Sequence, residues 1–170
     1  MSEILVYGAG GFAREVAWLA QRCSTDSHRL TVGCFIDDAS IPPGKQLNNV
    51  PVLSLEEARS RFPNGQVAIA VGKPAIRPML ASRVEQAGLR CATLVHPGVE
   101  ISEWVDVGEG SIVCAGSIIT TNIRIGRQVH INLDCTIGHD AVLGDFTTLA
   151  PGVHVSGWVL TGERVYIGTG

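Results

Sequence analysis

An aliphatic residue recurs at every sixth position through the second half of the chain. The series is Val95, Ile101, Val107, Val113, Ile119, Ile125, Ile131, Ile137, Leu143, Leu149, Val155 and Ile167, with one exception at Thr161. The residue after each of them is nearly always small or short and polar. No α-helix has this period. It is typical of short strands joined by corners, where the aliphatic side chain fills a prism and the small neighbour permits the bend. The repeat predicts a parallel β-helix over residues 93–170.

The repeat also places particular side chains in space. Three repeats make one coil of 18 residues, so residues 18 apart stack along the axis at about 4.8 Å. His139 and Asp140 follow the pair Ile137-Gly138 and should lie just past a corner, pointing outward. Asp140 would orient the imidazole as a general base for an amine or hydroxyl that becomes acylated. One coil further, the N–H of Gly157 could approach a thioester oxygen. The alternative is a solvated corner histidine.

Two further histidines precede interior aliphatic positions. His130 and His154 should face outward from flat faces, at the surface or a subunit interface. A zinc site built from three imidazoles, as in hexapeptide-repeat carbonic anhydrases, is a further alternative. His130 and His139 lie half a coil apart and would face different directions. We therefore expect no metal.

Residues 1–92 have a different pattern, in which strands alternate with helices. An apolar strand over 4–7 leads into Gly8-Ala9-Gly10-Gly11 and a helix, and a second strand over 30–36 ends at Asp37-Asp38. Ser54 and Glu57 form a capping box that starts a second helix. Gly72-Lys73-Pro74 leads into a third helix, with Pro74 expected at its first position. This order predicts a small parallel sheet.

The glycine turn places backbone N–H groups at a helix N-terminus, where a phosphate is favoured. Asp37, at the end of the second strand, could accept hydrogen bonds from ribose hydroxyls. The alternative is a tight turn without a ligand. Because residues 1–92 have room for only one mononucleotide-binding half, a nucleotide-linked sugar such as a UDP-sugar fits better than a dinucleotide.

Composition excludes several classes of protein. The five cysteines form no C-x-x-C pair, which favours reduced thiols over a disulfide framework. No apolar run reaches the roughly 18 residues of a membrane span, and glycines interrupt the N-terminal apolar stretch, so we expect no membrane insertion and a cytoplasmic location. With a formal net charge of -3 and no cluster of Lys and Arg, nucleic acid is not an expected partner.

The whole chain resembles the sugar O-/N-acyltransferase family, which includes sialic acid O-acetyltransferases and bacterial UDP-4-amino-sugar N-acetyltransferases. The segments that carry the resemblance are Gly8–Val16, Phe35–Asp38, Gly72-Lys73-Pro74 with Ile76-Arg77, Leu94–Pro97, Ile131-Asn132 and Ile137–Asp140. The resemblance implies an α/β plus β architecture. A small Rossmann-like, nucleotide-sugar-binding domain over residues 1–92 precedes a left-handed β-helix over residues 93–170, and the handedness rests on the resemblance alone.

The resemblance also implies roles for individual residues. His139 would be the catalytic base, Asp140 its acidic partner, and Gly157 the residue whose N–H contacts the thioester of acetyl-CoA. The nucleotide-sugar pocket would be formed by Gly8, Gly10, Gly11, Asp37, Asp38, Gly72 and Lys73. The family assembles as homotrimers with active sites between adjacent helices. These relations predict transfer of an acetyl group from acetyl-CoA to an amino or hydroxyl group of a nucleotide-linked sugar.

The chain departs from the family pattern in two places. Thr148 stands nine residues after the expected base, where some members have a second histidine, so the acceptor can be an amine or a hydroxyl. The repeat is still running at Ile167, whereas members continue with further coils, so we expect the C-terminal coils to be missing and acyl transfer to be weak or lost. Cations over 93–170 are confined to Arg124, Arg127 and Arg164. The rival hypothesis is a non-catalytic protein that binds a nucleotide sugar or acts as an oligomeric scaffold.

Overall fold

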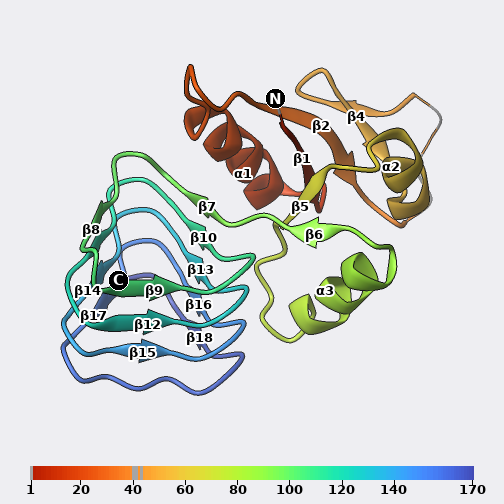
Figure 1. Cartoon of the computed structure of the whole chain (residues 1–170). Helices are drawn as coiled ribbons and strands as arrows, with labels where there is room; N and C mark the ends of the chain where they lie inside the picture. The colour runs from red at the N-terminus through yellow and green to blue at the C-terminus, as the bar shows by residue number, and fades with distance from the viewer. Residues whose placement is uncertain (1, 40–41, 43) are drawn as a thin grey trace. The chain divides into compact units, whose positions relative to one another are not determined.

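A computed structural model describes residues 2–39, 42 and 44–170, and it divides into two compact units (Figure 1). Unit 1 consists of Met1–Val71 and Met79–Ala92, and unit 2 of Gly72–Pro78 and Thr93–Gly170. The short segment Gly72–Pro78 thus groups with the C-terminal residues, although it lies within the N-terminal half of the sequence.

Unit 1 is an α/β layer structure. Its elements are β1 (Ser2–Tyr7), α1 (Gly11–Arg22), β2 (Leu30–Ile36), β3 (Gln46–Leu47), β4 (Val50–Leu53), α2 (Leu55–Arg61), β5 (Gln66–Ile69), α3 (Arg77–Gln86) and β6 (Arg90–Cys91). The sheet has the order β3-β4-β2-β1-β5-β6, and every pairing except that of β3 with β4 is parallel. This arrangement confirms the Rossmann-like parallel sheet.

The centre of this sheet brings two loops together. Strand β1 lies between β2 and β5, with Tyr7 beside Ile36 on one side and Ile69 on the other. Strand order reverses at β1, and ligands of open α/β sheets bind outside the carboxyl ends of strands at such a point. The glycine turn after β1 and Asp37 after β2 both leave the sheet at this edge.

The predicted start of the second helix is confirmed, whereas that of the third helix is wrong. The Ser54 hydroxyl accepts from the Glu57 backbone N–H and the Glu57 carboxylate accepts from the Ser54 N–H, so the capping box of α2 is confirmed. The expectation that Pro74 opens the third helix is wrong, because α3 begins at Arg77 after a turn. Pro78 is then its second residue, a position in the first turn where the missing N–H breaks no helical hydrogen bond.

Unit 2 is a parallel β-helix of short strands. They are β7 (Leu94–Val95), β8 (Glu100–Ile101), β9 (Val105–Val107), β10 (Ile112–Val113), β11 (Ile118–Ile119), β12 (Ile123–Ile125), β13 (His130–Ile131), β14 (Thr136–Ile137), β15 (Val142–Leu143), β16 (Thr148–Leu149), β17 (His154–Val155) and β18 (Tyr166–Ile167). They form three parallel sheets, β18-β16-β13-β10-β7, β17-β14-β11-β8 and β15-β12-β9. Ile137 pairs with Val155, and Ile119 with Ile137, so the predicted 18-residue coil is confirmed.

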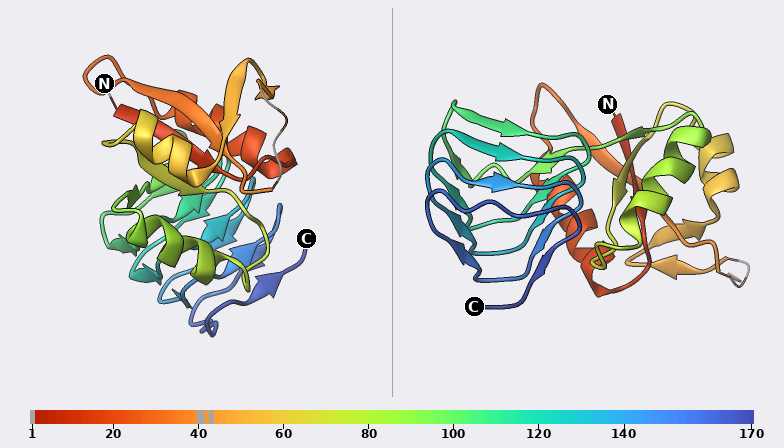
Figure 2. Two further views of the ribbon diagram at one scale, coloured as in Figure 1. Left: turned by 90° about the vertical axis from the view of Figure 1, so that its right-hand side faces the viewer. Right: turned by 90° about the horizontal axis from the view of Figure 1, so that it is seen from below.

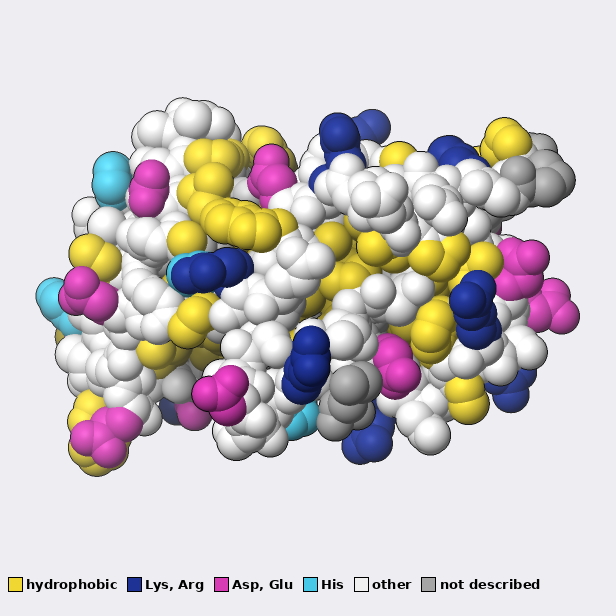
Figure 3. All heavy atoms as spheres, turned by 90° about the horizontal axis from the view of Figure 1, so that it is seen from above, with side chains coloured by type: hydrophobic (Ala, Val, Ile, Leu, Met, Phe, Trp, Pro, Cys, Tyr) yellow, Lys and Arg dark blue, Asp and Glu magenta, His cyan; other side chains and the backbone are white. Residues whose placement is uncertain are grey.

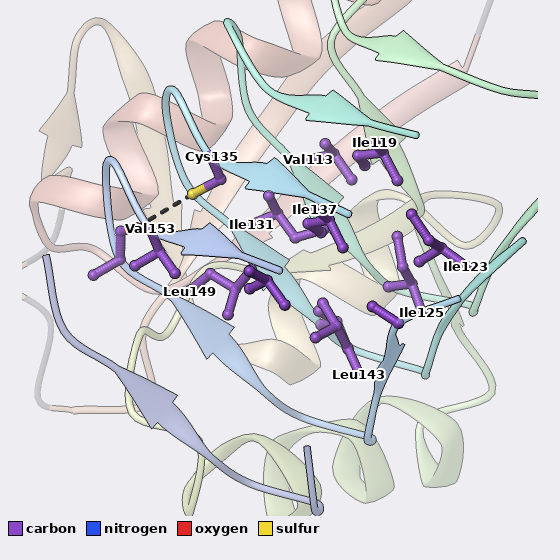
Figure 4. Packing of buried hydrophobic residues seen from close by; sticks show 14 residues of the cluster. Val113, Ile119, Ile123, Ile125, Ile131, Cys135, Ile137, Leu143, Leu149 and Val153 are labelled. Carbon is purple, nitrogen blue, oxygen red and sulfur yellow. Dashed lines mark hydrogen bonds between the residues drawn. The ribbon is translucent and has the colours of Figure 1, made fainter. Parts of the chain in front are cut away.

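The interior of the coils holds most of the aliphatic series (Figure 4), whereas Ile101 is exposed. The stacked coils are seen from two directions in Figure 2. Ile119, Ile131, Ile137 and Leu149 are almost completely buried and contribute to one continuous cluster. Each side chain of this size stabilises the fold by about 2 kcal/mol on burial. The core is therefore built coil by coil from the six-residue repeat.

The corners bend differently from the sequence-based expectation. The residue after each aliphatic position does not supply the turn, since Gly138 has no positive φ. A Cβ on Gly138 would lie 2.6 Å from the backbone nitrogen of Gly157, so this position is small because the next coil passes close to it. The positive φ occurs two residues later, as at Asp140, where φ is 59°.

Candidate functional site

His139 and Asp140 form a hydrogen-bonded pair at a corner of unit 2, directly after β14. His139 Nδ1 lies 2.9 Å from Asp140 Oδ2, and the His139 side chain is 57% exposed. An ionised carboxylate only accepts hydrogen bonds, so Nδ1 carries the proton of a neutral imidazole. In that tautomer Nε2 is the acceptor nitrogen, which is the arrangement that a general base needs.

Gly157 lies directly beside the other side of this imidazole. A Cβ built on Gly157 would come within 2.7 Å of both Cε1 and Nε2 of His139, a distance that real Cβ atoms do not show. Trp158 N donates to His139 O over 2.9 Å, which fixes the two coils against each other. Among the described residues we find no acceptor for the Gly157 N–H. Gly157 and the imidazole of His139 are therefore neighbours on adjacent coils, as the 18-residue period predicts.

Two exposed tryptophans belong to the column of residues next to His139. Trp158 is 73% exposed, and its ring meets that of His139 edge-on with centroids 6.3 Å apart. Trp104, three coils earlier in the same column, is 67% exposed. The expectation that both corner columns point outward is confirmed for these side chains and for His139.

The other two β-helix histidines differ from each other. His154 is exposed, as predicted, and its Nδ1 lies 2.8 Å from Thr136 Oγ1. His130 is fully buried, so the expectation of an outward-facing surface residue is wrong. Thr148, its register partner one coil further, is bonded to Gly72 O and to Arg77. The segment Gly72–Pro78 covers this face of the sheet, which no six-residue pattern reveals.

Arg77 is the buried cation of this covering segment. Its guanidinium donates to Gln128 O at 3.1 Å, Thr147 O at 3.0 Å and Thr148 Oγ1 at 2.8 Å, and also to Phe146 O. Burial lowers its pKa to about 10, so it remains charged at neutral pH. The Thr148 hydroxyl is therefore part of this structural hydrogen-bond network. It does not lie at the corner that carries His139.

The glycine turn of unit 1 has two kinds of glycine. Gly8 has a φ of +127°, and a Cβ there would lie 3.1 Å from Ala70 O, so only glycine fits. A Cβ on Gly10 would meet nothing within 4 Å, and both Gly10 and Gly11 are exposed. Their backbone lies at the N-terminus of α1, whose N–H groups and dipole favour an anion.

The two acidic residues after β2 have different surroundings. Asp38 accepts from the Tyr7 hydroxyl, from Leu55 N at 3.1 Å and from Arg83 at 2.8 Å. Burial of Tyr7 is the main cause that raises the pKa of its phenol well above the ordinary value, and the hydrogen bond to Asp38 raises it further. The phenol therefore keeps its proton and donates it in this hydrogen bond. Asp37 Oδ1 accepts from Ala39 N, and we find no other hydrogen bond to this carboxylate among the described residues. Asp38 is therefore held by several partners in the loop, whereas Asp37 has one.

Gly72 and Lys73 are exposed, but they belong to unit 2 rather than to the unit that contains the glycine turn. Gly72 O accepts from Arg77 and Thr148. In the described part of the chain, no group of three or more His, Cys, Asp or Glu is placed to hold a metal ion. None of the helices described is both long and apolar enough to cross a bilayer.

Comparison with known proteins agrees with this architecture. Residues 3–84 match the family described as the PglD N-terminal domain. The chain is 34% identical to WeeI from Acinetobacter baumannii AYE, with a TM-score of 0.89, over 100% of this chain and 79% of that one. It belongs to the sugar acyltransferase family of hexapeptide-repeat transferases. As a member of this family it is 29% identical to GDP-perosamine N-acetyltransferase of Escherichia coli O157:H7, over 97% of this chain and 75% of that protein.

A third relative of this sugar acyltransferase was solved with a ligand. The acetyltransferase domain of PglB from Neisseria gonorrhoeae FA1090, in complex with acetyl coenzyme A, is 28% identical with a TM-score of 0.85, over 99% of this chain and 80% of that one. On the face of the molecule in Figure 3, Lys and Arg side chains are scattered and acidic side chains lie between several of them.

Proposed function

We propose that this chain transfers an acetyl group from acetyl-CoA to the amino group of a nucleotide-linked sugar, with His139 as the general base. The arrangement that carries the proposal is the corner where Asp140, His139 and Gly157 meet. The name of the E. coli relative, a GDP-perosamine N-acetyltransferase, supports an amine acceptor, and the PglB complex supports acetyl-CoA as donor.

In this proposal each residue of the corner has one step. Nε2 of His139 accepts a proton from the amine as its nitrogen attacks the thioester carbonyl carbon. Asp140 holds the opposite ring nitrogen protonated and stabilises the imidazolium that forms. The Gly157 N–H donates to the carbonyl oxygen as negative charge develops there. The carbon–sulfur bond then breaks, and the proton held by His139 passes to the departing sulfur of coenzyme A.

In unit 1, the exposed backbone of Gly10 and Gly11 would bind the phosphates of the nucleotide, and Asp37 its ribose hydroxyls. Gly8 shapes the turn, and Asp38 fixes the loop through Tyr7 and Arg83. Gly72 and Lys73, which belong to unit 2, are proposed as further substrate-binding residues, with the exposed Lys73 as a cation for a phosphate.

The assembly and the compartment are also part of the proposal. Exposed apolar side chains on unit 2, among them Ile118, Leu133 and Leu160, support burial between β-helices in a homotrimer. Sedimentation equilibrium should give about three times the 18.0 kDa chain mass. The five cysteines are not joined in disulfides in this structure, which fits a reducing compartment and supports the cytoplasm.

The test follows thiol release from acetyl-CoA in the presence of GDP-perosamine or a UDP-linked amino sugar. His139→Ala should lower kcat by about 10³-fold, the usual contribution of a general base. The matched control is His154→Ala, an exposed histidine hydrogen-bonded on the next coil, which should retain wild-type kcat. Equal turnover in the His139 variant and the wild type would reject His139 as the base, and no turnover with any such sugar would reject the function.

A further inference from the structure

A small pocket on the β-helix lies on the two coils that precede the His139 corner. It has a volume of about 200 Å³ and is lined by Trp104, Asp106, Asn122, Ile123 and Arg124. Asp106 and Arg124 are register partners on the parallel strands β9 and β12, and both side chains are exposed. Ile123 also lines the pocket, although its side chain belongs to the interior cluster of the coils. All five residues belong to unit 2.

The position of this pocket follows from the coil. Trp104, Asn122, Asp140 and Trp158 occupy one corner column at intervals of 18 residues. Asp140 N donates to Thr121 O over 3.1 Å, so the corner of Asn122 directly neighbours that of the His139–Asp140 pair. Coils are spaced by about 4.8 Å, which puts the pocket within about 5–10 Å of the base. A pyranose ring can bridge that interval.

The two sides of His139 differ chemically. On one side lies Gly157, whose N–H is suited to the thioester oxygen of the donor. The Gly157 side also carries the exposed indole of Trp158. On the other side lie the indole of Trp104, a carboxylate, a carboxamide and a guanidinium. An aromatic face packs against the C–H face of a sugar ring, while Asp, Asn and Arg bond its hydroxyls and a phosphate attached to it. The pocket is smaller than the 300–1,000 Å³ of sites for larger ligands, which favours a single sugar ring.

We propose that this pocket binds the sugar ring of the acceptor and determines which sugar is acetylated. Trp104 stacks on the ring, Asp106 and Asn122 bond its hydroxyl groups, and Arg124 bonds the hydroxyl or phosphate oxygens nearest to it. This assignment rests on the proposed function. It explains why an exposed tryptophan and the first of the few β-helix cations stand beside the catalytic corner.

The test is calorimetric binding without acetyl-CoA, using the nucleotide-linked amino sugar that the wild-type chain acetylates and the corresponding free nucleoside diphosphate. Trp104→Ala should weaken binding of the nucleotide sugar about tenfold, leave binding of the free nucleotide unchanged and leave the KM for acetyl-CoA unchanged. Arg124→Gln should also weaken binding of the nucleotide sugar. Tyr166→Ala, which removes another exposed aromatic ring of unit 2, is the matched control and should bind as the wild type does.

Trp104 is exposed, so melting temperatures should show that the variants fold. Unchanged affinity for the nucleotide sugar in the Trp104 and Arg124 variants would overturn this inference and leave the proposed function standing. Equal weakening for the nucleotide sugar and the free nucleotide in Trp104→Ala would place the nucleotide in the pocket and would also overturn it. Absence of wild-type turnover with every amino sugar would overturn the proposed function and this inference together.

Discussion

At the residue scale, the corners of the β-helix impose a left-handed backbone at every sixth residue. The φ angle lies between 55° and 77° at Gly110, Gly116, Asn122, Gln128, Asp134, Asp140, Phe146, Gly152, Trp158 and Arg164. Gly, Asn and Asp adopt this conformation readily, whereas bulky side chains are strained in it. Phe146 is compensated by burial and by Arg127, whose guanidinium lies 5.3 Å from its ring centroid. Trp158 is exposed and has no such compensation from burial.

Trp158→Asn should therefore stabilise the protein. Relief of the left-handed strain is expected to raise the free energy of unfolding by about 1 kcal/mol, since the exposed indole contributes little burial. The measurement is chemical denaturation followed by circular dichroism. Trp104→Asn is the matched control, because Trp104 is equally exposed but has no positive φ, and it should leave stability nearly unchanged. Equal effects in the two variants would contradict the strain argument.

Gly157→Ala should impair acetyl transfer without unfolding the β-helix. The added methyl group would lie 2.7 Å from the imidazole of His139, so the ring must move away from its position between Asp140 and the Gly157 N–H. A displacement of about 1 Å can cost about 10²-fold in kcat. Gly162→Ala, where a Cβ meets nothing within 4 Å, should retain wild-type kcat. Full activity in Gly157→Ala would show that this contact does not position the base.

At the element scale, the segment before α3 is held on the β-helix by hydrogen bonds of Arg77 and Thr148. Arg77 satisfies the carbonyls of Gln128, Phe146 and Thr147 and the hydroxyl of Thr148, all in buried surroundings. A buried acceptor that loses its donor costs about 1–3 kcal/mol. The position of this segment therefore depends on polar contacts rather than on the repeat.

Arg77→Met should lower the free energy of unfolding by about 3 kcal/mol or more, because several buried acceptors lose a charged donor at once. Urea denaturation measures this loss. Arg83→Met is the control for removing a partly exposed arginine, whose single ion pair with Asp38 is worth at most about 1 kcal/mol. Comparable losses in both variants would argue against the Arg77 network as the main anchor.

Helix α2 should show a pH-dependent cap. Hydrogen bonds from the Ser54 N–H and hydroxyl lower the pKa of Glu57 below its ordinary value. A lowered folded-state pKa means that the stabilisation is present above the ordinary glutamate pKa and is lost as the pH falls through the folded-state value. Ser54→Ala should lower stability by about 1 kcal/mol at neutral pH, and this difference should shrink on acidification. Denaturation curves at neutral and acid pH test both statements.

At the scale of the whole molecule, each unit has its own apolar core, and the cysteines divide between core and periphery. Burial raises the pKa of Cys34 to about 12 and also raises that of Cys135, whereas Cys23 and Cys91 are partly exposed. Thiolates are the reactive species, so buried protonated thiols should not react.

A thiol reagent at mildly alkaline pH should therefore modify Cys23 and Cys91 in the native protein, and Cys34, Cys114 and Cys135 after denaturation. Mass spectrometry of reagent-treated peptides identifies the modified residues. Rapid modification of Cys34 or Cys135 under native conditions would contradict the burial of these thiols in the two cores.

The sequence by itself determined the β-helix, the coil length, the outward position of His139 beside Asp140, and Gly157 as its neighbour. It could do so because a six-residue period converts distance along the chain directly into position in space. Only the tertiary structure decided the burial of His130, the network of Arg77, the engagement of Asp38 with Tyr7 and Arg83, and the start of α3. These features depend on contacts between segments that are far apart in the sequence. Such contacts are set by the packing of one segment on another, and they leave no periodic pattern in the sequence.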